Sequence, residues 1–346
     1  MKKTIVIIGA GMMGSALSVP LSDNGHCVRV AGTCLDDEII AYARENRFHK
    51  TMKRALPEGN EYFYYRDLDQ AMKGADIVVD GVSSFGVDWF IENVLDRIPE
   101  EIPILCVTKG LICEDDGTLT AFPEYMKRKS ALRHSISAIG GPCTSYELAD
   151  RRHSSVAFCG KNMETLKMLR ETFETSYYHV SLSTDVAGVE CAVAMKNAYA
   201  LAVSMAVGMI QKQEGENATL AYNPQAAIFG QAVREMRRLL KLAGGSDDNI
   251  VYAAGDLYVT VYGGRTRLLG TLLGRGLTFA EAMEKLKGVT LESVSIASRT
   301  VRAIRLLSAR GAAREEDFPI LMYIGSLLEG KPDTGMPWEK FEVVEG

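Results

Sequence analysis

Patterns for binding metals and for forming disulfides are scarce in this sequence of 346 residues, which holds five histidines and seven cysteines. A zinc site needs Cys and His clustered at ligand spacing, whereas the histidines are scattered at His26, His49, His134, His153 and His179. No two cysteines form a Cys-x-x-Cys pair, and their odd number fits buried thiols in a reducing compartment. The sequence therefore predicts no metal site and a cytoplasmic location.

A long apolar run and a strong excess of positive charge are also missing. The longest uncharged apolar run, Ala198–Ile210, is shorter than the roughly 20 residues that a membrane span requires. Met1-Lys2-Lys3 leads directly into a strand-like stretch, unlike a signal peptide with its spacer and cleavage site. The formal net charge of -5 argues against a surface that neutralises many nucleic-acid phosphates. We expect a soluble protein with no membrane span and no nucleic-acid partner.

The length of the chain exceeds what one hydrophobic core usually organises, so we expect two domains. The first half alternates short β-branched runs with helical segments such as Met13–Asn24 and Met163–Phe173, which predicts a parallel sheet covered on both faces. The expected strands are Thr4–Ile8, Cys27–Ala31, Tyr62–Tyr65, Asp76–Val82, Ile102–Thr108, Ser135–Ile139, Ser154–Cys159 and Tyr178–Leu182.

Strand patterns stop after about Ser183, and helical patterns continue to the carboxyl end. Asn223-Pro224 predicts an N-cap with proline at the first helical position, opening a helix that runs through Leu242. Thr278 and Glu281 have the spacing of a capping box. We predict an α/β domain with a doubly wound sheet over residues 1–185, followed by an all-helical domain over residues 186–346.

A glycine motif follows the first expected strand, Thr4–Ile8, and precedes a helix: residues 9–14 read Gly-Ala-Gly-Met-Met-Gly. In this setting Gly9 permits a tight turn, Gly11 lets a pyrophosphate approach the backbone, and Gly14 allows close packing of the helix. The phosphate then binds at the amino end of the helix. The motif predicts a Rossmann-type NAD(P) site that includes Gly9, Gly11, Met12, Met13 and Gly14.

The choice between NAD and NADP rests on the end of the second expected strand, which carries no acid to bind the ribose 2′-hydroxyl of NAD. No arginine stands there to bind a 2′-phosphate either, although Arg29 is near in sequence and Thr33 can bond either form. We lean slightly towards NADP(H). Asp36 and Asp37 can reverse that preference, but we interpret them as the solvated start of the next helix.

A lysine interrupts the apolar segment Gly188–Ile210, where Lys196-Asn197 is inserted into an otherwise buried helix. Burying an ammonium group costs several kcal/mol unless it is paired, and desolvation favours its neutral form. Lys196 is therefore a candidate for proton transfer. A structural ion pair and a lysine that extends to the surface are the alternatives.

Two further polar segments follow expected strands at the carboxyl edge of the sheet, where open α/β domains bind ligands. Lys109 follows the strand Ile102–Thr108 and can reach a substrate phosphate or carbonyl. Gly140-Gly141-Pro142 follows another strand and brings bare backbone to the same edge.

The helical half adds two candidates. Asp256 and Thr260 are four residues apart and share one face of a helix. Arg265 and Thr266 follow the pair Gly263-Gly264, which suits a phosphate clamp. Each of these segments taken alone also fits a helix cap, a tight turn or a solvated charge.

Together and in this order, the motifs resemble NAD(P)-dependent glycerol-3-phosphate dehydrogenase, from the glycine loop to at least Glu292. The resemblance implies that Lys196 is the catalytic acid/base, assisted by Lys109 and Asp256. It implies that Lys109, Gly141, Asn197, Asp256 and Thr260 line the glycerol moiety and that Arg265 and Thr266 hold its phosphate. Besides the glycine loop, the implied cofactor contacts are Thr33, Lys109, Ser145, Arg265 and Glu292.

The implied reaction is the interconversion of dihydroxyacetone phosphate and sn-glycerol 3-phosphate, which supplies precursors of glycerophospholipids. The chain departs from the family pattern at Thr266, where asparagine is usual, at Gln225 and Gly230, where basic residues are usual, and at Cys143. A reductase of a larger ketose or polyol phosphate and a non-catalytic NAD(P)-binding regulator are therefore the alternatives. The apolar helical half favours a homodimer.

Overall fold

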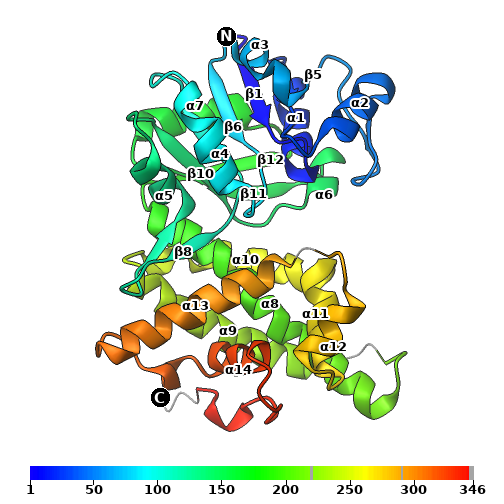
Figure 1. Ribbon diagram of the computed structural model, residues 1–346, viewed down its shortest axis with the longest axis vertical. Coiled ribbons are helices and arrows are strands. Elements are labelled where there is room, and N and C mark those ends of the chain that lie inside the picture. Colours follow the sequence, from blue (N-terminus) through cyan, green and yellow to red (C-terminus); the bar gives the residue numbers. More distant parts are fainter. Residues whose placement is uncertain (219–220, 290, 343–346) are drawn as a thin grey trace. The chain divides into compact units, whose positions relative to one another are not determined.

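The computed structural model describes residues 1–218, 221–289 and 291–342, which fold as two compact units (Figure 1). The first unit comprises Met1–Lys109 and Ala121–Glu190, and the second comprises Gly110–Thr120 and Cys191–Gly346. The first holds a large sheet with helices, and the second is built mainly of helices. This arrangement confirms the predicted fold class.

Eight strands form the sheet of the first unit in the order β12-β11-β10-β7-β6-β1-β2-β5. Neighbouring strands are parallel except for β10 and β11, which are antiparallel. The strands are β1 (Thr4–Ile8), β2 (Cys27–Ala31), β5 (Glu61–Phe63), β6 (Ile77–Asp80), β7 (Ile104–Cys106), β10 (Ile136–Gly140), β11 (Ser154–Cys159) and β12 (Tyr178–Ser183). The helices are α1 (Met12–Asp23), α2 (Asp37–Asn46), α3 (Leu68–Met72), α4 (Val87–Asn93), α5 (Phe122–Lys129), α6 (Ser145–Ala149) and α7 (Met163–Phe173).

The central strands are buried on both faces, as the apolar runs predicted. All of Ile5–Ile8 in β1 is inaccessible to solvent, and β6 is fully buried along its length. The predicted bounds of β1, β2 and β11 are confirmed residue for residue. The prediction of a strand over Ile102–Thr108 is too long, because β7 pairs with β6 and β10 only over Ile104–Cys106.

The second unit is organised around α8 (Val186–Glu214), a 29-residue helix that begins in the last residues of the first unit. The other helices are α9 (Tyr222–Leu242), α10 (Ile250–Val261), α11 (Gly264–Gly274), α12 (Phe279–Lys285), α13 (Glu292–Ala309) and α14 (Pro319–Leu328). Glycines bring α11 against α8, since a Cβ atom on Gly274 would lie 2.1 Å from the carbonyl oxygen of Met205. Helices that pack this closely bury the side chains of α8, which is why α8 is apolar.

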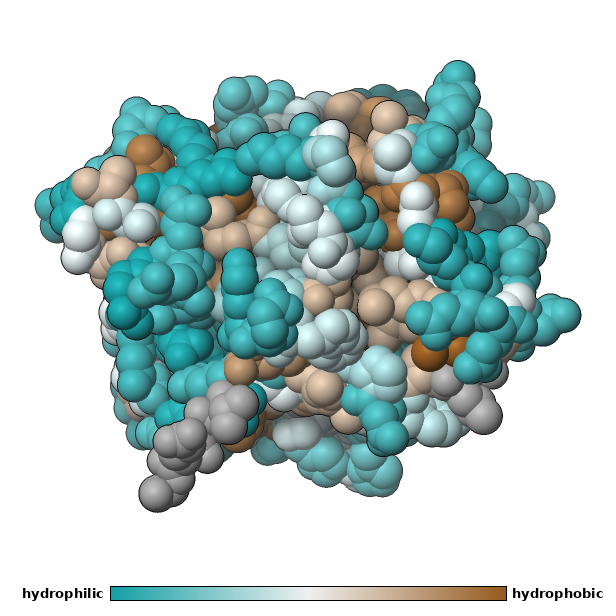
Figure 2. All heavy atoms as spheres, turned by 90° about the horizontal axis from the view of Figure 1, so that it is seen from below, coloured by the Kyte–Doolittle hydropathy of each residue, from teal (hydrophilic) through white to brown (hydrophobic). Residues whose placement is uncertain are grey.

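Among the described residues, α8 is the one helix long and apolar enough to cross a membrane. In its most apolar 18-residue window 78% of the residues are buried inside the protein, as in the core helix of a folded domain. The face in Figure 2 carries hydrophilic residues over much of its two sides, with smaller patches of apolar residues between them. The apolar character of α8 therefore reflects packing within the second unit.

The predicted N-cap at Asn223 is wrong, because α9 begins at Tyr222 with Ala221 as its N-cap. Asn223 and Pro224 lie inside the first turn, where the missing N–H of proline costs no helical hydrogen bond. At the other end Gly244 adopts a φ of 78° and closes the helix. The capping box of Thr278 and Glu281 is confirmed at the start of α12.

The predicted division at residues 185 and 186 differs from the structure at residues 110–120, which belong to the second unit. This segment carries β8 (Leu111–Cys113) and leads into β9 (Leu119–Ala121), and it packs against α13. Arg299 of α13 donates to the carbonyl oxygen of Leu111 at 2.9 Å. Three-residue strands are too short to show the alternation of apolar and polar residues that predicts a strand. The sequence therefore did not indicate that residues 110–120 belong to the second unit.

Candidate active site

Each glycine of the loop between β1 and α1 has the geometry expected of a dinucleotide site. Gly9 has a φ of 106°, and a Cβ atom there would lie 2.8 Å from the carbonyl carbon of Gly81. A Cβ atom on Gly14 would lie 2.4 Å from the carbonyl oxygen of Gly9. At Gly11 no atom comes within 4 Å of that position, which leaves room for a pyrophosphate group beside the backbone.

The loop leads into the amino end of α1, where unpaired N–H groups and the helix dipole favour an anion. Met12 is exposed at this end, and Met13 is half-buried. Ser145, the third predicted contact in this region, begins α6, which packs against α1. The loop and its surroundings therefore fit NAD(P), and the predicted contacts from Gly9 to Gly14 lie together.

Two side chains that the sequence did not assign to the site hold the peptide of Ala10 inside the glycine loop. Asp36 accepts the N–H of Ala10 through Oδ2 at 3.2 Å, and the same oxygen accepts the N–H and the hydroxyl of Thr33 at 2.7 and 2.8 Å. Asp36 does stand at the start of a helix, as the N-cap of α2, but the prediction that its carboxylate is solvated there is wrong. It joins the end of β2 to the glycine loop.

The second of these side chains is His49, which lies in the short hairpin of β3 (Phe48–His49) and β4 (Arg54–Ala55). Its Nδ1 accepts the N–H of Met52 at 3.1 Å, so its Nε2 carries the proton and donates to the carbonyl oxygen of Ala10 at 3.1 Å. His49 is 2% exposed. Its partner lies 39 residues away, so no local motif in the sequence points to it.

A cluster of cations lies at the carboxyl ends of β2 and β5, next to Thr33. The N–H of Gly32 bonds the carbonyl of Phe63 at 2.9 Å, and Tyr64 follows immediately. Arg44 and Arg66 lie over the ring of Tyr64, 4.4 and 4.1 Å from its centroid. The sequence analysis did not identify this cluster, because Arg44 lies in α2, 20 residues before Tyr64 and 22 before Arg66.

Arg29, the arginine that the sequence brought near the cofactor, lies elsewhere. Its guanidinium donates to the carbonyl oxygens of Ala71 and Lys73 at 3.0 and 2.8 Å, at the end of α3. It also pairs with Glu61 at 3.3 Å. These contacts keep Arg29 occupied at the carboxyl end of a helix, so it is not a contact for the ribose.

Lys109 and Gly141, two of the predicted substrate residues, lie together in the first unit. The Nζ of Lys109 donates to the carbonyl oxygen of Gly141 at 2.7 Å, and Gly141 has a φ of 101°. Both line a cavity of about 20 Å³ with Met13, Cys143 and Tyr178. Burial raises the pKa of the Tyr178 hydroxyl and keeps it neutral. The cavity therefore presents one cation among apolar and neutral groups.

The second unit brings Lys196 and Asp256 together. The Nζ of Lys196 in α8 lies 2.5 Å from Oδ1 of Asp256 in α10. The side chains are 14% and 1% exposed. The alternative of a lysine that extends to the surface is therefore excluded. The hydroxyl of Thr260 donates to the carbonyl oxygen of Asp256 at 2.6 Å, so the predicted acid and hydroxyl are neighbours.

The expected phosphate clamp lies at the amino end of α11. Gly263 is the N-cap, and Arg265 and Thr266 occupy the first turn, where backbone N–H groups lack helical acceptors. Arg265 is exposed, and Thr266 is half-buried. A guanidinium beside a helix amino end is a suitable site for a phosphate group.

The remaining predicted residues lie in the helices of the second unit. Asn197 follows Lys196 in α8 and is half-buried, and Glu292 is the first residue of α13. Gln225 lies in the first turn of α9, and Gly230 lies in its middle. The predicted proton-transfer and phosphate residues thus belong to one unit, and the glycine loop with Lys109 belongs to the other.

Comparison with known proteins matches both parts of the chain. Residues 4–166 match the family model of the NAD-dependent glycerol-3-phosphate dehydrogenase N-terminus, and residues 185–335 match that of the C-terminus. The crystal structure of glycerol-3-phosphate dehydrogenase from Coxiella burnetii covers 98% of this chain and of its own, with a TM-score of 0.78 and 23% identity. This structure supports the fold.

Curated relatives of similar sequence carry the same family name. The NADP(+)-dependent glycerol-3-phosphate dehydrogenase of Archaeoglobus fulgidus is 36% identical over 285 residues, which are 82% of this chain and 83% of the relative. Glycerol-3-phosphate dehydrogenase [NAD(P)+] of Bacillus velezensis is 28% identical over 89% of this chain and 86% of its own length. These matches confirm the resemblance seen in the motifs, and the chain belongs to the NAD-dependent glycerol-3-phosphate dehydrogenase family.

Proposed function

We propose that the protein is an NAD(P)-dependent dehydrogenase that interconverts dihydroxyacetone phosphate and sn-glycerol 3-phosphate. Family membership and the names of the relatives support this activity. The observation that carries it is the buried pair of Lys196 and Asp256, 2.5 Å apart beside the apolar core of the second unit. An ion pair buried in such a core is costly, and a catalytic role explains its presence.

Lys196 moves the proton at the C2 oxygen of the substrate. The cofactor, when bound, supplies or accepts the hydride at C2. As an ammonium group, Lys196 donates its proton to the carbonyl oxygen of dihydroxyacetone phosphate. As a neutral amine, it accepts the hydroxyl proton of glycerol 3-phosphate in the reverse reaction. Asp256 fixes the position of the Nζ atom, and Thr260 and Asn197 line the glycerol moiety.

Arg265 and Thr266 bind the substrate phosphate at the start of α11, where the guanidinium can form two parallel hydrogen bonds with it. The threonine hydroxyl adds a short donor beside them. For Lys109 we keep the role that the family resemblance implies, which is to stabilise the alkoxide that develops at the carbonyl oxygen. Because Lys109 already donates to Gly141, its Nζ is held in place before the substrate binds.

We also propose that NADPH is the preferred cofactor. Asp36 lies close to the end of β2. Its Oδ2 atom already accepts three hydrogen bonds, from the N–H of Ala10 and from the N–H and the hydroxyl of Thr33. Arg66 lies over Tyr64 at the carboxyl end of β5 with a side chain 67% exposed, so its guanidinium can meet a 2′-phosphate. Its contact with Asp37 is 3.8 Å long and solvated, which a phosphate can replace.

A panel of three- to six-carbon ketose phosphates, each with NADH and NADPH, tests the proposal. We expect the highest kcat/KM for dihydroxyacetone phosphate with NADPH. A higher value for a longer sugar would instead identify a reductase of larger ketose phosphates, which the short side chain of Thr266 favours. Binding of the cofactor without turnover of any substrate would identify a regulatory protein.

We further propose that the enzyme works in the cytoplasm as a homodimer and supplies glycerol 3-phosphate for phospholipid synthesis. All seven cysteines are free thiols, as in a reducing compartment. Exposed apolar side chains such as Tyr258 and Tyr262 offer surface for a second copy. Cell fractionation tests the location, and light scattering of the purified protein tests the oligomeric state, where a monomer in solution would contradict the homodimer. Loss of phospholipid synthesis on deletion of the gene, restored by added glycerol 3-phosphate, is expected if the enzyme has the proposed metabolic role.

A further inference from the structure

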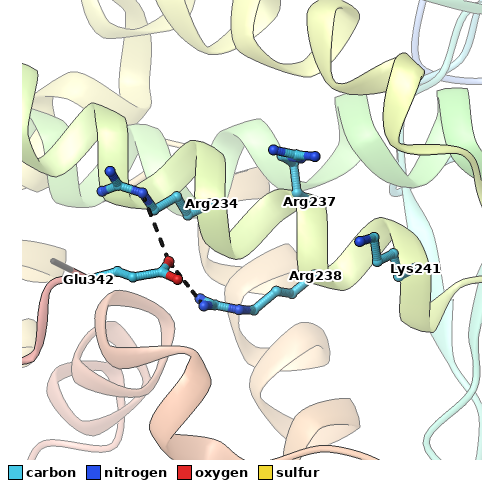
Figure 3. Close-up of a pocket in the computed structure, with 5 residues that line it drawn as sticks. All are labelled: Arg234, Arg237, Arg238, Lys241 and Glu342. Atoms are coloured by element: carbon cyan, nitrogen blue, oxygen red, sulfur yellow. Dashed lines mark hydrogen bonds and ion pairs between the residues drawn. The ribbon is translucent and has the colours of Figure 1, made fainter. Parts of the chain in front are cut away.

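Four basic side chains follow one face of α9 over its last two turns. Arg234, Arg237, Arg238 and Lys241 are spaced at i, i+3, i+4 and i+7, so they lie along one side of the helix. With Glu342 they line a cavity of about 240 Å³, which we call the α9 pocket (Figure 3). None of these residues belongs to the proposed active site.

Among the residues that the structure describes, two carboxylates contact these four cations. Glu342 lies 3.8 Å from Nε of Arg234 and 3.0 Å from Nη2 of Arg238, and both guanidinium groups point towards it in Figure 3. Asp247, in the turn after α9, lies 3.0 Å from both Arg237 and Lys241. Hydrogen bonding to Lys241 lowers the pKa of Asp247 and keeps it ionised.

The two carboxylates balance half of the formal charge of the four cations. A concentration of positive charge of this kind is unexpected in a protein with a net charge of -5. Like charges along one helix face also destabilise the helix unless an anion lies among them. The α9 pocket therefore has capacity for an anion with more charge than one carboxylate.

Glu342 already occupies the position that such an anion would take. Its carboxylate lies between Arg234 and Arg238, and its backbone N–H donates to Oε1 of Gln231 at 3.1 Å. The ion pairs themselves are well exposed, with side-chain exposures of 43% for Arg234 and 41% for Glu342. Pairs this exposed contribute at most about 1 kcal/mol, so a stronger anion can displace the carboxylate.

We propose that the α9 pocket is a second anion site, which binds a small molecule carrying a diphosphate or triphosphate group in competition with Glu342. Guanidinium groups match phosphate oxygens in pairs, and three arginines within two turns can contact a chain of linked phosphates. The site is separate from the clamp of Arg265 and Thr266, because it lies on another helix and uses none of the same residues.

The backbone of Glu342 is connected to the core of the second unit through Gln231, which accepts the N–H of Glu342. The Nε2 of Gln231 donates to Oε1 of Glu235 at 3.2 Å. Glu235 in turn accepts the N–H groups of Ile320 and Leu321 at the start of α14. These bonds hold the chain at Glu342 while its carboxylate is free to give way to another anion.

Isothermal titration calorimetry with pyrophosphate, which measures its affinity for the protein, tests the proposal. We expect the combined variant Arg234→Gln/Arg237→Gln to bind pyrophosphate at least tenfold more weakly than the wild type. Glu342→Gln removes the competing carboxylate, and we expect it to bind up to about fivefold more tightly, the equivalent of one exposed ion pair. Arg302→Gln on α13, whose partner Asp115 is fully exposed, is the matched control and leaves binding unchanged.

Tryptophan fluorescence of the segment that carries Glu342 offers a second measurement of binding. Trp338 lies four residues before Glu342 and packs against Phe341 with ring centroids 5.2 Å apart. We expect pyrophosphate to change tryptophan fluorescence in the wild type, with the same midpoint as in calorimetry. Equal binding by the wild type and the α9 variants, or binding that Arg265→Gln abolishes, would overturn the proposal. So would equal affinity for sulfate at the same ionic strength.

Discussion

The side chain of His49 is hydrogen-bonded to the carbonyl oxygen of Ala10, with Nε2 and oxygen 3.1 Å apart, so a buried imidazole holds the glycine loop that is predicted to bind the cofactor phosphates. On the other side of the same residue, the N–H of Ala10 is bonded to Asp36. The peptide of Ala10 is thus fixed at both polar groups. A loop fixed in this way needs little reordering when the cofactor binds.

His49→Ala tests this relationship. The variant loses two hydrogen bonds of about 1 kcal/mol each, one to Ala10 and one from Met52. Only the first contacts the glycine loop, so we expect the KM for the cofactor to rise roughly fivefold while kcat stays within twofold. His179→Ala is the control, because His179 is exposed on β12, where its ring is hydrogen-bonded to that of His153 at 3.0 Å. An unchanged cofactor KM in His49→Ala would show that the loop keeps its shape without the imidazole.

Gly11 and Gly14 allow the fold and the cofactor site to be tested separately. A methyl group at Gly14 would collide with the carbonyl oxygen of Gly9 at 2.4 Å, so we expect Gly14→Ala to lower the melting temperature and abolish cofactor binding. A methyl group at Gly11 meets no atom of the protein within 4 Å. We therefore expect Gly11→Ala to melt like the wild type and still lose cofactor binding. Normal NADPH affinity in Gly11→Ala would refute the assignment of the open space to pyrophosphate.

Arg66→Ala tests the preference for NADPH. Loss of the guanidinium beside the 2′-position is expected to raise the KM for NADPH about tenfold and to leave the KM for NADH nearly unchanged. Steady-state kinetics with both cofactors measure the difference. Arg97→Ala is a suitable control, since Arg97 also forms an exposed ion pair, with Asp69. Equal losses with both cofactors in Arg66→Ala would contradict the proposal.

The parts of the fold that could be predicted from sequence are those with strong local patterns. β1 is a run rich in β-branched residues, and β11 is apolar over its last four residues. The helix α7 begins at Met163, directly after Asn162, whose side chain caps it by accepting the N–H groups of Glu164 and Thr165. The predicted start of α9 is two residues late, because Asn223-Pro224 satisfies the rules for a helix start whereas the actual N-cap, Ala221, makes no side-chain cap. Local rules fix the existence of a helix better than its first residue.

The residues of the candidate site likewise fall into those that a local pattern reveals and those that depend on long-range contacts. Lys196 could be found because a charge inside an apolar helix is conspicuous, and Asp256 because it shares a helix face with Thr260. Asp36 and His49 could not be assigned, since their partner Ala10 lies 26 and 39 residues away in sequence. Long-range contacts of this kind depend on how the strands are ordered in the sheet, which no short motif records.

Lys196→Ala is expected to lower kcat at least about a hundredfold, the range typical for loss of a general acid or base. Cofactor binding, measured by NADPH fluorescence, should remain close to that of the wild type, because the glycine loop belongs to the first unit. Lys167→Ala, on the exposed face of α7, is the control. A near-normal kcat in Lys196→Ala would refute its catalytic role.

Asp256→Asn removes the carboxylate that lies 2.5 Å from Nζ of Lys196 and keeps the volume of the side chain. Because Asp256 is almost completely buried, we expect the free energy of unfolding to fall by about 3 kcal/mol. We also expect kcat to fall while the KM for the substrate changes little, since the phosphate clamp is untouched. Denaturant unfolding and steady-state kinetics measure the two effects, and full stability in Asp256→Asn would show that the ion pair contributes nothing to folding.

Glu235 predicts a pH dependence for the second unit. Burial raises its pKa to about 7 from 4.5, against the hydrogen bonds from Ile320 and Leu321, which lower it. Because the folded value lies above the unfolded one, the stabilisation is complete below about pH 4.5 and is lost as the pH rises through about 7, a change of at most about 3 kcal/mol. We expect the stability advantage of the wild type over Glu235→Gln to be larger at pH 5 than at pH 8. Denaturant midpoints of both proteins measured at the two pH values decide the point, and an advantage that does not change with pH would mean that Glu235 has an ordinary pKa.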